Sequence, residues 1–493
     1  MSQPPRTPSG SDLTAALVLL KELQPALQQG DRAKQSEVVR RLVALRAPMG
    51  DQWQALANLA LQNGELTVAR EAIDLFVAAR GGTPDAQYRK AALLEQSGAL
   101  REAYALMCTL PADTPNPAAN AYSRGTAALF LGEAEEARRQ LDRATRLQPQ
   151  SGPAWLSLAM AADLAQEPEL AERIIAAERD IAAAPPVQRA AYYYAQGKAY
   201  AESGEPAQGF AAFARGAREM RSNVAYDRNA DRVNAEDSLR GYSAARLAAL
   251  ARRQTEPTRR AIFVTGLPRS GTTLVQQILT SHSAVGDGAE TSRLGLLADE
   301  VRGHSWPALE RYEAAHGPSR AAKLWQHWLS ERFPAPGRVV DKSLDTTRFI
   351  GLAAGLLPEA PLIWVTRDPL DRAWSCFRTF FPAGLPWSFD LEEIAFHFRL
   401  EDQLLARWQE ILGDRLLVIP FESLVGEPET GIRRVLAHCS LPEEPQVFAP
   451  HKSDRTVTTA SVMQVRRPIS RQAVGSAAPY REFLEPFVTA YRH

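Results

Sequence analysis

The sequence lacks the features that mark several common protein classes. Only three cysteines occur in 493 residues, and they lie far apart, so neither a disulfide framework nor a CxxC metal site is predicted. Basic and acidic residues number 57 each, and this balance argues against general binding to nucleic acid or anionic membranes. No run approaches the roughly 20 apolar residues that span a bilayer, and the polar start MSQPPRTPSGSD is unlike a secretory signal. These absences predict a cytoplasmic protein without a membrane or nucleic-acid partner.

The first half of the chain has the composition of helices. Residues 13–250 are rich in Ala, Leu, Glu and Arg and contain few β-branched residues. Four glycines, each between two apolar helical stretches, recur every 34 residues: Gly30, Gly64, Gly98 and Gly132. A small residue follows the last three of them at a distance of five: Ala69, Ala103 and Ala137. A helical hairpin needs a turn glycine with free φ and a small residue where its helices approach.

This period resembles the tetratricopeptide repeat. The resemblance implies an α-helical solenoid of five to six units over residues 13–250, after a disordered N-terminus of residues 1–12. Such arrays bind a protein segment or mediate self-association, so a peptide in the groove and a homo-oligomer are both expected partners. A generic helical bundle with chance spacing is the alternative.

After about residue 257 the pattern changes to alternating strands and helices. AIFVTG, APLIWVT and RLLVIPF are short β-rich runs, and longer helical stretches separate them. This alternation predicts an α/β domain with a central parallel sheet over residues 258–493. The charged segment ALARRQTEPTRR carries the predicted boundary.

GLPRSGTT keeps the glycine spacing of a phosphate-binding loop. Gly266 and Gly271 are five apart, after a strand and before a helix, where free N–H groups and the helix dipole attract an anion. A P-loop kinase would place lysine after the second glycine, but Thr272 and Thr273 follow here and the cation is Arg269. The predicted ligand is therefore one phosphate-like group rather than a magnesium triphosphate. A glycine turn without a ligand is the alternative. No carboxylate pair or His/Cys cluster has metal-ligand spacing, so no metal is predicted.

The loop resembles the 5′-phosphosulfate loop of sulfotransferases, which use 3′-phosphoadenosine 5′-phosphosulfate (PAPS). The resemblance implies contacts to this co-substrate from Pro268, Arg269, Ser270, Gly271, Thr272 and Thr273. WVTRDPLDRAWSCF resembles the 3′-phosphate motif, with Arg367 at a strand end and Ser375 eight residues on, although Arg367 and Asp368 could form a structural ion pair instead. SVMQVRRP resembles a segment of tyrosylprotein sulfotransferases, which implies contacts from Ser461 and Arg467. The resemblance covers residues 258 to 490, and repeat arrays fused to such a domain resemble a bacterial sulfotransferase group.

The same resemblance implies the catalytic residues. Glu290 in GDGAETSR matches the glutamate base, and His282 is the rival base, because small-molecule sulfotransferases use histidine. Lys342 in VVDKSLDTT would stabilise the leaving oxygen together with Arg269; a salt bridge from Lys342 to Asp341 or Asp345 is the structural alternative. Surface solvation is the favoured interpretation for two further arginines, Arg378 and Arg466.

Two departures from these families bear on specificity. An arginine that helps place the acceptor in the tyrosylprotein enzymes has Ser292 in its place, with Arg293 one step further. An Arg-Trp pair that is frequent in the bacterial group is replaced by Ser476 and Ala477 in VGSAAPY. The first puts tyrosine specificity in question, and the second puts the donor contacts in question.

The sequence therefore predicts a PAPS-dependent O-sulfotransferase. The preferred acceptor is a peptide or protein hydroxyl, with tyrosine first, and a carbohydrate or small-molecule hydroxyl is close behind. A P-loop kinase or nucleotide hydrolase is the rival enzyme class, and a nucleotide-binding repeat scaffold without turnover is the rival from a different class.

Overall fold

The structure is a computed structural model. It describes residues 10–288, 293–317, 319–343, 346–382, 385–453 and 466–492. Its contacts divide the chain into two compact units, which are treated separately below: Met1–Asn120 with Trp325–Ala335, and Ala121–Leu324 with Pro336–His493.

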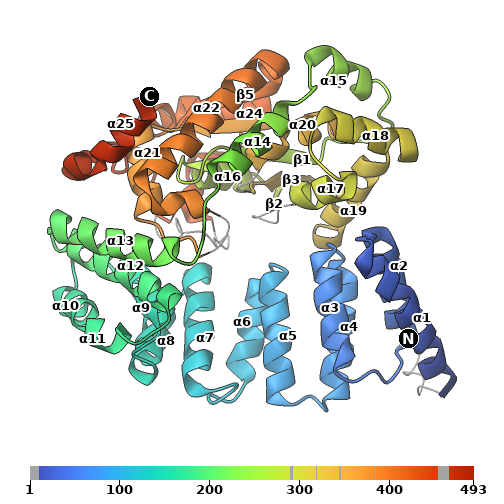
Figure 1. Ribbon diagram of the computed structural model, residues 1–493, viewed down its shortest axis with the longest axis horizontal. Helices are drawn as coiled ribbons and strands as arrows, with labels where there is room; N and C mark the ends of the chain where they lie inside the picture. The colour runs from blue at the N-terminus through green and yellow to red at the C-terminus, as the bar shows by residue number, and fades with distance from the viewer. Residues whose placement is uncertain are drawn as a thin grey trace. The chain divides into compact units, whose positions relative to one another are not determined.

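The first unit is built from helical hairpins (Figure 1). Its helices are α1 (Gly10–Gln28), α2 (Arg32–Leu45), α3 (Gln52–Gln62), α4 (Leu66–Ala79), α5 (Pro84–Gln96) and α6 (Leu100–Thr109). The turns after α3 and α5 hold Gly64 and Gly98, both at φ 81°, in the left-handed region where a side chain is strained. Trp53, Ile73 and Phe76 are fully buried in its core, and their burial drives the pairing of the hairpins.

The second unit begins with further helices. They are α7 (Pro117–Leu131), α8 (Ala134–Leu147), α9 (Gly152–Met160), α10 (Pro168–Ala176), α11 (Glu178–Ile181), α12 (Pro186–Glu202), α13 (Pro206–Arg221), α14 (Arg228–Leu239) and α15 (Ala244–Ala251). Gly132 and Gly204 occupy the turns of α7–α8 and α12–α13 at φ 85° and 82°. The predicted helical region is thus confirmed, and its assignment to the tetratricopeptide repeat remains a prediction.

A five-stranded parallel sheet follows in the same unit. The strands are β1 (Ala261–Thr265), β2 (Val285–Asp287), β3 (Arg338–Asp341), β4 (Leu362–Thr366) and β5 (Leu416–Pro420), and their order is β2-β3-β1-β4-β5. Every residue of β1 is buried, as expected for the centre of a parallel sheet covered on both faces. Because all strands run the same way, the loops after β1, β3 and β4 leave one edge of the sheet together.

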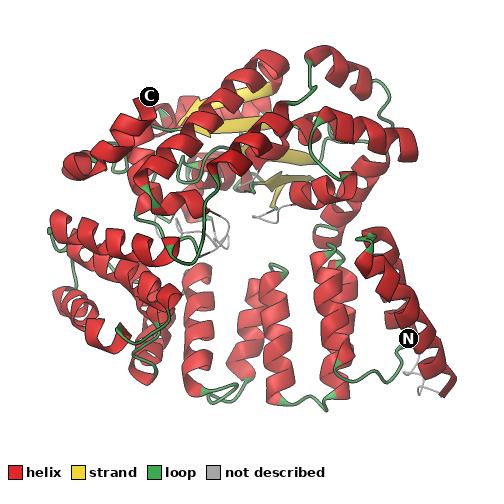
Figure 2. Cartoon of the chain, in the orientation of Figure 1, coloured by secondary structure: helices red, strands yellow, loops and turns green. Residues whose placement is uncertain are grey.

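Helices cover both faces of this sheet (Figure 2). The helices after β1 are α16 (Thr272–Thr280), α17 (Arg293–Val301), α18 (Trp306–His316), α19 (Arg320–Arg332), α20 (Thr346–Leu356), α21 (Pro369–Phe377), α22 (Leu391–Leu412), α23 (Phe421–Gly426), α24 (Pro428–His438) and α25 (Glu485–Arg492), and α19 from Trp325 onward belongs to the first unit. Short 3-10 segments are η1 (Pro386–Phe389), η2 (Gly413–Arg415), η3 (Pro445–Phe448), η4 (Pro450–Lys452) and η5 (Ala478–Leu484). The predicted parallel sheet is confirmed: β1, β4 and β5 were expected as strands, whereas the short β2 and β3 were not.

An aromatic core joins the last helical hairpin to the sheet domain. The ring of Phe213 on α13 meets Trp374 of α21 edge-on, with centroids 5.7 Å apart. Trp374 in turn stacks on Tyr480 of η5 at 3.8 Å. These side chains are buried in one cluster, and aromatic packing of this kind is among the strongest contributions to a core. The helical hairpin α12–α13 therefore fixes α21 in place.

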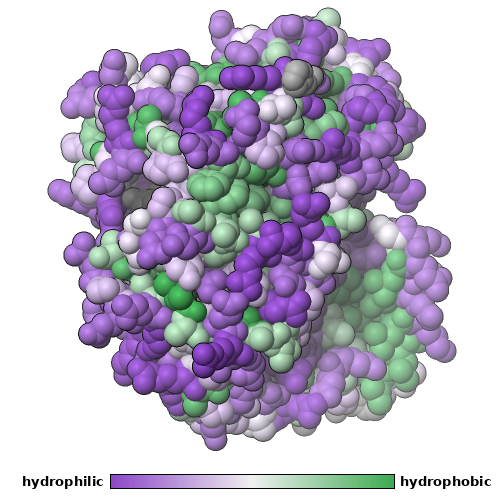
Figure 3. Space-filling model, turned by 60° about the vertical axis from the view of Figure 1, so that its left-hand side comes forward, coloured by the Kyte–Doolittle hydropathy of each residue, from purple (hydrophilic) through white to green (hydrophobic). Residues whose placement is uncertain are grey.

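The surface turned toward the viewer in Figure 3 is mostly hydrophilic, with smaller hydrophobic areas. Among the described helices, none combines the length and the hydropathy needed to cross a membrane.

Candidate functional site

The loop between β1 and α16 forms a cradle of backbone N–H groups. Gly266, Arg269 and Gly271 all have positive φ, at 133°, 67° and 103°. Arg269 adopts the left-handed conformation that non-glycine residues rarely take, and such strain is concentrated at functional positions. Alternation of left- and right-handed residues turns successive N–H groups toward one side, which creates an anion-binding nest at the start of α16.

The loop's side chains also suit an oxyanion. Thr272 and Thr273 are buried at the N-terminus of α16. Ser270 is completely buried, and among the described residues its hydroxyl has no hydrogen-bond partner. A buried hydroxyl without a partner costs free energy, so a ligand oxygen in the cradle would satisfy it. A Cβ at Gly266 would clash with the Val365 carbonyl oxygen and lie 3.0 Å from the same hydroxyl, so a side chain does not fit there. These groups fit the phosphosulfate end of PAPS.

The two predicted co-substrate motifs meet in space. Arg269 donates from Nε to the Ser375 hydroxyl at 2.9 Å, and Arg367 donates from Nη1 to the Arg269 carbonyl oxygen at 3.1 Å. Ser375 was expected to lie beside Arg367, but its hydroxyl accepts from Arg269, because α21 begins just after Arg367 and turns the serine toward the loop. Arg367 sits over the ring of Phe421 at 5.0 Å. The ion pair with Asp368 is not what holds Arg367, since Asp368 instead caps α21 through Asp371 N.

A third arginine, Arg378, joins this cluster. It caps the C-terminal end of α21, is half-buried, and lies 5.6 Å from the ring centroid of Trp374. Burial lowers the pKa of Arg269 to about 10, and the positive charges of Arg378 and Arg367 contribute to the shift. The expectation that Arg378 is a solvated surface residue is therefore wrong. Three guanidinium groups that disfavour each other's charge form a site that an anion would stabilise.

A lysine follows the carboxyl end of β3, at the same end of the sheet as the loops after β1 and β4. Lys342 directly follows β3 and is buried, and β3 pairs with β1, which leads into the cradle. Beside it, Asp341 accepts a hydrogen bond from the Ser343 hydroxyl at 2.9 Å and lies 3.8 Å from Arg293 Nη1. Lys342 thus follows the strand next to the one that leads into the cradle, and its catalytic role remains a prediction. Asp345 lies outside the described residues.

The predicted base Glu290 also lies outside the described residues. Its described neighbours on either side both contact β3: Gly288 N donates to Val340 O at 2.7 Å, and Arg293 faces Asp341. Arg293 lies one position after the place of the acceptor-placing arginine of the tyrosylprotein enzymes. It is buried at the start of α17. Its charge is directed at the carboxyl end of β3.

The rival base, His282, is held by backbone groups. Its Nδ1 accepts from Ala284 N at 3.1 Å, and its Nε2 lies 3.1 Å from the Pro442 carbonyl oxygen. Because Nδ1 accepts from an amide, Nε2 is the nitrogen that faces the Pro442 carbonyl as a donor, and Glu444 Oε1 lies 3.7 Å from it. The ring lies beyond the C-terminal end of α16, whereas the cradle is at its N-terminus. Nine residues at about 1.5 Å each separate the two ends. These contacts favour a structural role for His282, and the choice of base remains a prediction.

The C-terminal segment reaches the arginine cluster at residues 473–477. Arg367 Nη2 donates to the Ala473 carbonyl oxygen and lies 3.5 Å from the Ser476 hydroxyl. Of the two earlier predicted contacts here, Ser461 lies outside the described residues, and the exposed Arg467 faces Asp163 at 3.6 Å. Arg466, expected to be solvated, is half-buried and donates to the Phe130 carbonyl oxygen at 3.4 Å.

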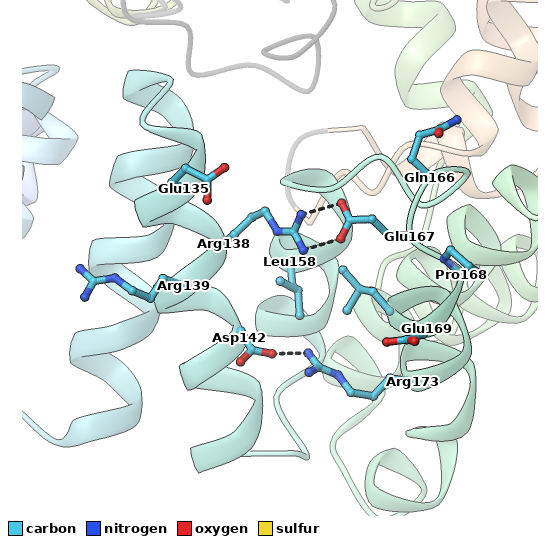
Figure 4. Close-up of a pocket in the computed structure, with 11 residues that line it drawn as sticks. Glu135, Arg138, Arg139, Asp142, Leu158, Gln166, Glu167, Pro168, Glu169 and Arg173 are labelled. Atoms are coloured by element: carbon cyan, nitrogen blue, oxygen red, sulfur yellow. Dashed lines mark hydrogen bonds and ion pairs between the residues drawn. The ribbon is translucent and has the colours of Figure 1, made fainter.

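A separate pocket of about 870 Å³ lies in the helical part of the second unit. Figure 4 shows Arg138 of α8 reaching across to Glu167 at the start of α10, and Asp142 meeting Arg173 below them. The pocket is lined by charged and polar side chains together with Leu158, Pro168 and Leu170, and by none of the cradle residues. It is a groove between helices, apart from the cradle residues.

Comparison with known proteins points to one family for the sheet domain. The model of the Sulfotransferase family matches residues 261–445, which therefore carry a domain of that family. A curated protein of Aquifex aeolicus (strain VF5), described as uncharacterized, is 31% identical over 245 residues, which make up 47% of this chain and 32% of that protein. The chain thus spans about a third of the length of the curated relative it matches.

Several solved sulfotransferases are also similar to the chain. The sulfotransferase domain of the curacin biosynthetic pathway is 16% identical with a TM-score of 0.29 and covers 46% of this chain and 98% of its own. Sulfotransferase STF9 of Mycobacterium avium is 17% identical with a TM-score of 0.28, over 60% and 91%. A mouse sulfotransferase complexed with PAP is 12% identical with a TM-score of 0.30, over 50% and 90%.

Proposed function

We propose that the protein is a PAPS-dependent O-sulfotransferase. The observation that carries this proposal is the cluster of Arg269, Ser375 and Arg367 around a backbone nest. The cradle offers N–H groups and hydroxyls to one phosphosulfate group, and Arg367, whose Nε has no hydrogen-bond partner among the described residues, offers its positive charge to a second phosphate. Thr272 stands where a P-loop kinase has its lysine, which disfavours the triphosphate alternative.

Each bond change of the proposed reaction requires a specific side chain. PAPS supplies an activated sulfuryl group; its S–O bond to phosphate breaks while a new S–O bond to the acceptor oxygen forms. Negative charge grows on the departing phosphate oxygen, which the Arg269 guanidinium and Lys342 ammonium would stabilise. The acceptor hydroxyl loses its proton to the Glu290 carboxylate, the base implied by family resemblance. In this scheme Glu290 takes the proton, and Arg269 and Lys342 compensate the growing negative charge.

We further propose a peptide or protein hydroxyl, tyrosine first, as the acceptor. The groove between α8 and α10 supports this choice, because its ion pairs Arg138–Glu167 and Arg173–Asp142, with Glu135 and Glu169, form a polar surface for an extended chain. Helical arrays bind segments of this kind along such surfaces. The groove belongs to the same compact unit as the cradle.

Donor binding and group transfer are tested separately. Calorimetric titration of the purified chain with adenosine 3′,5′-bisphosphate, the desulfated product of PAPS, tests the cradle, and absence of binding would overturn the proposal. Incubation with PAPS and a cell extract, followed by mass spectrometry of sulfated species, then identifies the acceptor. Binding without any sulfated product would favour the repeat scaffold without turnover, whereas magnesium-dependent ATP hydrolysis would favour the nucleotide hydrolase.

A further inference from the structure

We infer that the turn between α7 and α8 anchors the C-terminal segment 466–477 and so helps to build the donor site. The inference rests on the proposed function, since it concerns the segment that touches Arg367. It gives the helical part of the second unit a role in binding the donor, in addition to any role in recruiting an acceptor.

The first anchor is the contact between Gly132 and Arg466. A Cβ built on Gly132 would lie 2.6 Å from both terminal nitrogens of Arg466, so the guanidinium lies directly on the bare backbone of the turn. Arg466 also donates from Nη2 to the carbonyl oxygen of Phe130, at 3.4 Å, in the last turn of α7. Orphan carbonyls at a helix C-terminus and the negative end of its dipole favour a cation at this place.

Only some of the turn glycines are covered by a distant side chain. In the first unit, a Cβ on Gly64 would meet the ring of Trp328, and one on Gly98 would meet the guanidinium of Arg332. At Gly30 and Gly204, by contrast, nothing lies within 4 Å of the corresponding position. Three successive glycines of the 34-residue period therefore each receive a large side chain from the second half of the sequence.

The second anchor holds the other end of the segment. The Asp371 carboxylate, buried on α21, accepts from Gly475 N at 2.6 Å and from Ala477 N at 2.8 Å. A carboxylate that takes two backbone N–H groups fixes the chain as a helix cap does. Asp371 also lies 4.0 Å from Arg367 Nη2. The anchored backbone is what places the Ala473 carbonyl and the Ser476 hydroxyl at the Arg367 guanidinium.

The two anchors lie on either side of the residues that touch Arg367. Arg466 fastens one end to the helical turn and Asp371 fastens the other to the helix that carries Ser375. A loose segment would have to be ordered when the donor binds, and the entropy cost of that ordering would weaken the affinity. An anchored segment is ordered beforehand. Gly132, Arg466 and Asp371 are therefore positioning residues, which act on the donor through residues 473–477.

A matched pair of glycine substitutions tests the first anchor. Gly132→Ala and Gly204→Ala place the same methyl group at nearly the same φ, 85° and 82°, so both incur the same backbone strain. Only the first displaces an arginine. We expect Gly132→Ala and Arg466→Ala to weaken binding of adenosine 3′,5′-bisphosphate about three- to tenfold, as loss of pre-organisation does, while Gly204→Ala binds as the wild type does.

Three further measurements separate anchoring from general damage. The Gly132→Ala/Arg466→Ala double variant should bind no more weakly than either single variant, because both remove one contact. Asp371→Asn should raise the KM for PAPS and leave kcat near its wild-type value. Thermal denaturation should give Gly132→Ala and Gly204→Ala similar Tm values.

The outcomes distinguish this inference from the proposed function. If the wild-type chain does not bind adenosine 3′,5′-bisphosphate, the proposed function fails. If the wild type binds and Gly132→Ala, Arg466→Ala and Gly204→Ala all bind equally well, the anchoring role fails while the sulfotransferase remains. Additive losses in the double variant would also contradict a shared contact.

Discussion

The Arg269 guanidinium and the Ser375 hydroxyl are separated by 106 positions in the chain and meet at 2.9 Å. This bond joins the loop after β1 to the helix after β4, two strands that are neighbours in the sheet. It ties the predicted sulfate end of the donor site to the predicted 3′-phosphate end. A donor that spans both ends therefore contacts one connected hydrogen-bond network. We expect a substitution at either end to lower the affinity for the donor.

Loss of the Ser375 hydroxyl should weaken donor binding without unfolding the protein. Ser375→Ala removes the acceptor of a charge-assisted hydrogen bond, worth about 1.5–3 kcal/mol, or roughly 10- to 100-fold in affinity. Titration with adenosine 3′,5′-bisphosphate measures the change. Ser238→Ala is the matched control, because Ser238 is as buried and its hydroxyl donates to Ala235 O in α14, apart from the cradle residues. Equal affinities of the two variants would contradict the assignment.

Sequence patterns were sufficient for the elements that carry strong local signals. The β-rich runs gave β1, β4 and β5, and the glycine spacing of GLPRSGTT gave the cradle. The strands β2 and β3 were missed because they have only three and four residues, too few to show a periodicity. Without these two strands the strand order could not be predicted, since β3 lies between β2 and β1.

Side-chain partners were predicted less well than backbone elements. Nothing in the sequence near Arg378 distinguishes it from a solvated arginine; its burial follows from the packing of Trp374, which only the tertiary fold provides. The contact of Arg466 with Gly132 likewise joins residues far apart in the chain. A spacing of eight residues put Ser375 beside the right cluster but could not select Arg269 over Arg367 as its partner.

The two candidate bases should respond differently to substitution. Glu290→Gln should retain affinity for adenosine 3′,5′-bisphosphate and lower kcat by about 10²- to 10⁴-fold, the range for a general base. His282→Ala should keep kcat but destabilise the domain by about 1–3 kcal/mol, because it leaves backbone groups of Ala284 and Pro442 without their partner. Steady-state kinetics and denaturant unfolding measure the two effects. Full turnover by Glu290→Gln would show that another residue takes the proton.

The shared aromatic core should couple the helical hairpin α12–α13 to donor binding. Phe213→Ala removes a buried ring that packs on Trp374, next to Ser375, and should cost about 3–5 kcal/mol. We expect weaker binding of adenosine 3′,5′-bisphosphate as well, because α21 loses its support. Phe76→Ala empties an equally buried position in the first unit and serves as the control. It should lower stability by a similar amount and leave donor affinity unchanged; if both variants bind equally, the core does not position α21.

Within the first unit, stability should depend on pH through His327 and Glu65. Their Nε2–Oε2 distance is 3.2 Å, and the hydrogen bond to Glu65 raises the pKa of His327 above its ordinary 6.5. Burial alone would raise the pKa of Glu65, but hydrogen bonds from His327 and Arg40 outweigh it and lower that pKa below 4.5. The histidine contribution is complete below pH 6.5 and is lost as pH rises through its folded-state pKa, while the glutamate contribution is lost as pH falls through its own.

The pair therefore stabilises most between these two limits. His327→Gln should reduce the free energy of unfolding more near pH 5.5 than near pH 8.5, because glutamine keeps a donor but carries no charge. Denaturant unfolding of wild type and variant at the two pH values measures the difference. A His327→Gln loss that is the same at both pH values would mean that the protonated histidine contributes no more than a neutral donor at this contact.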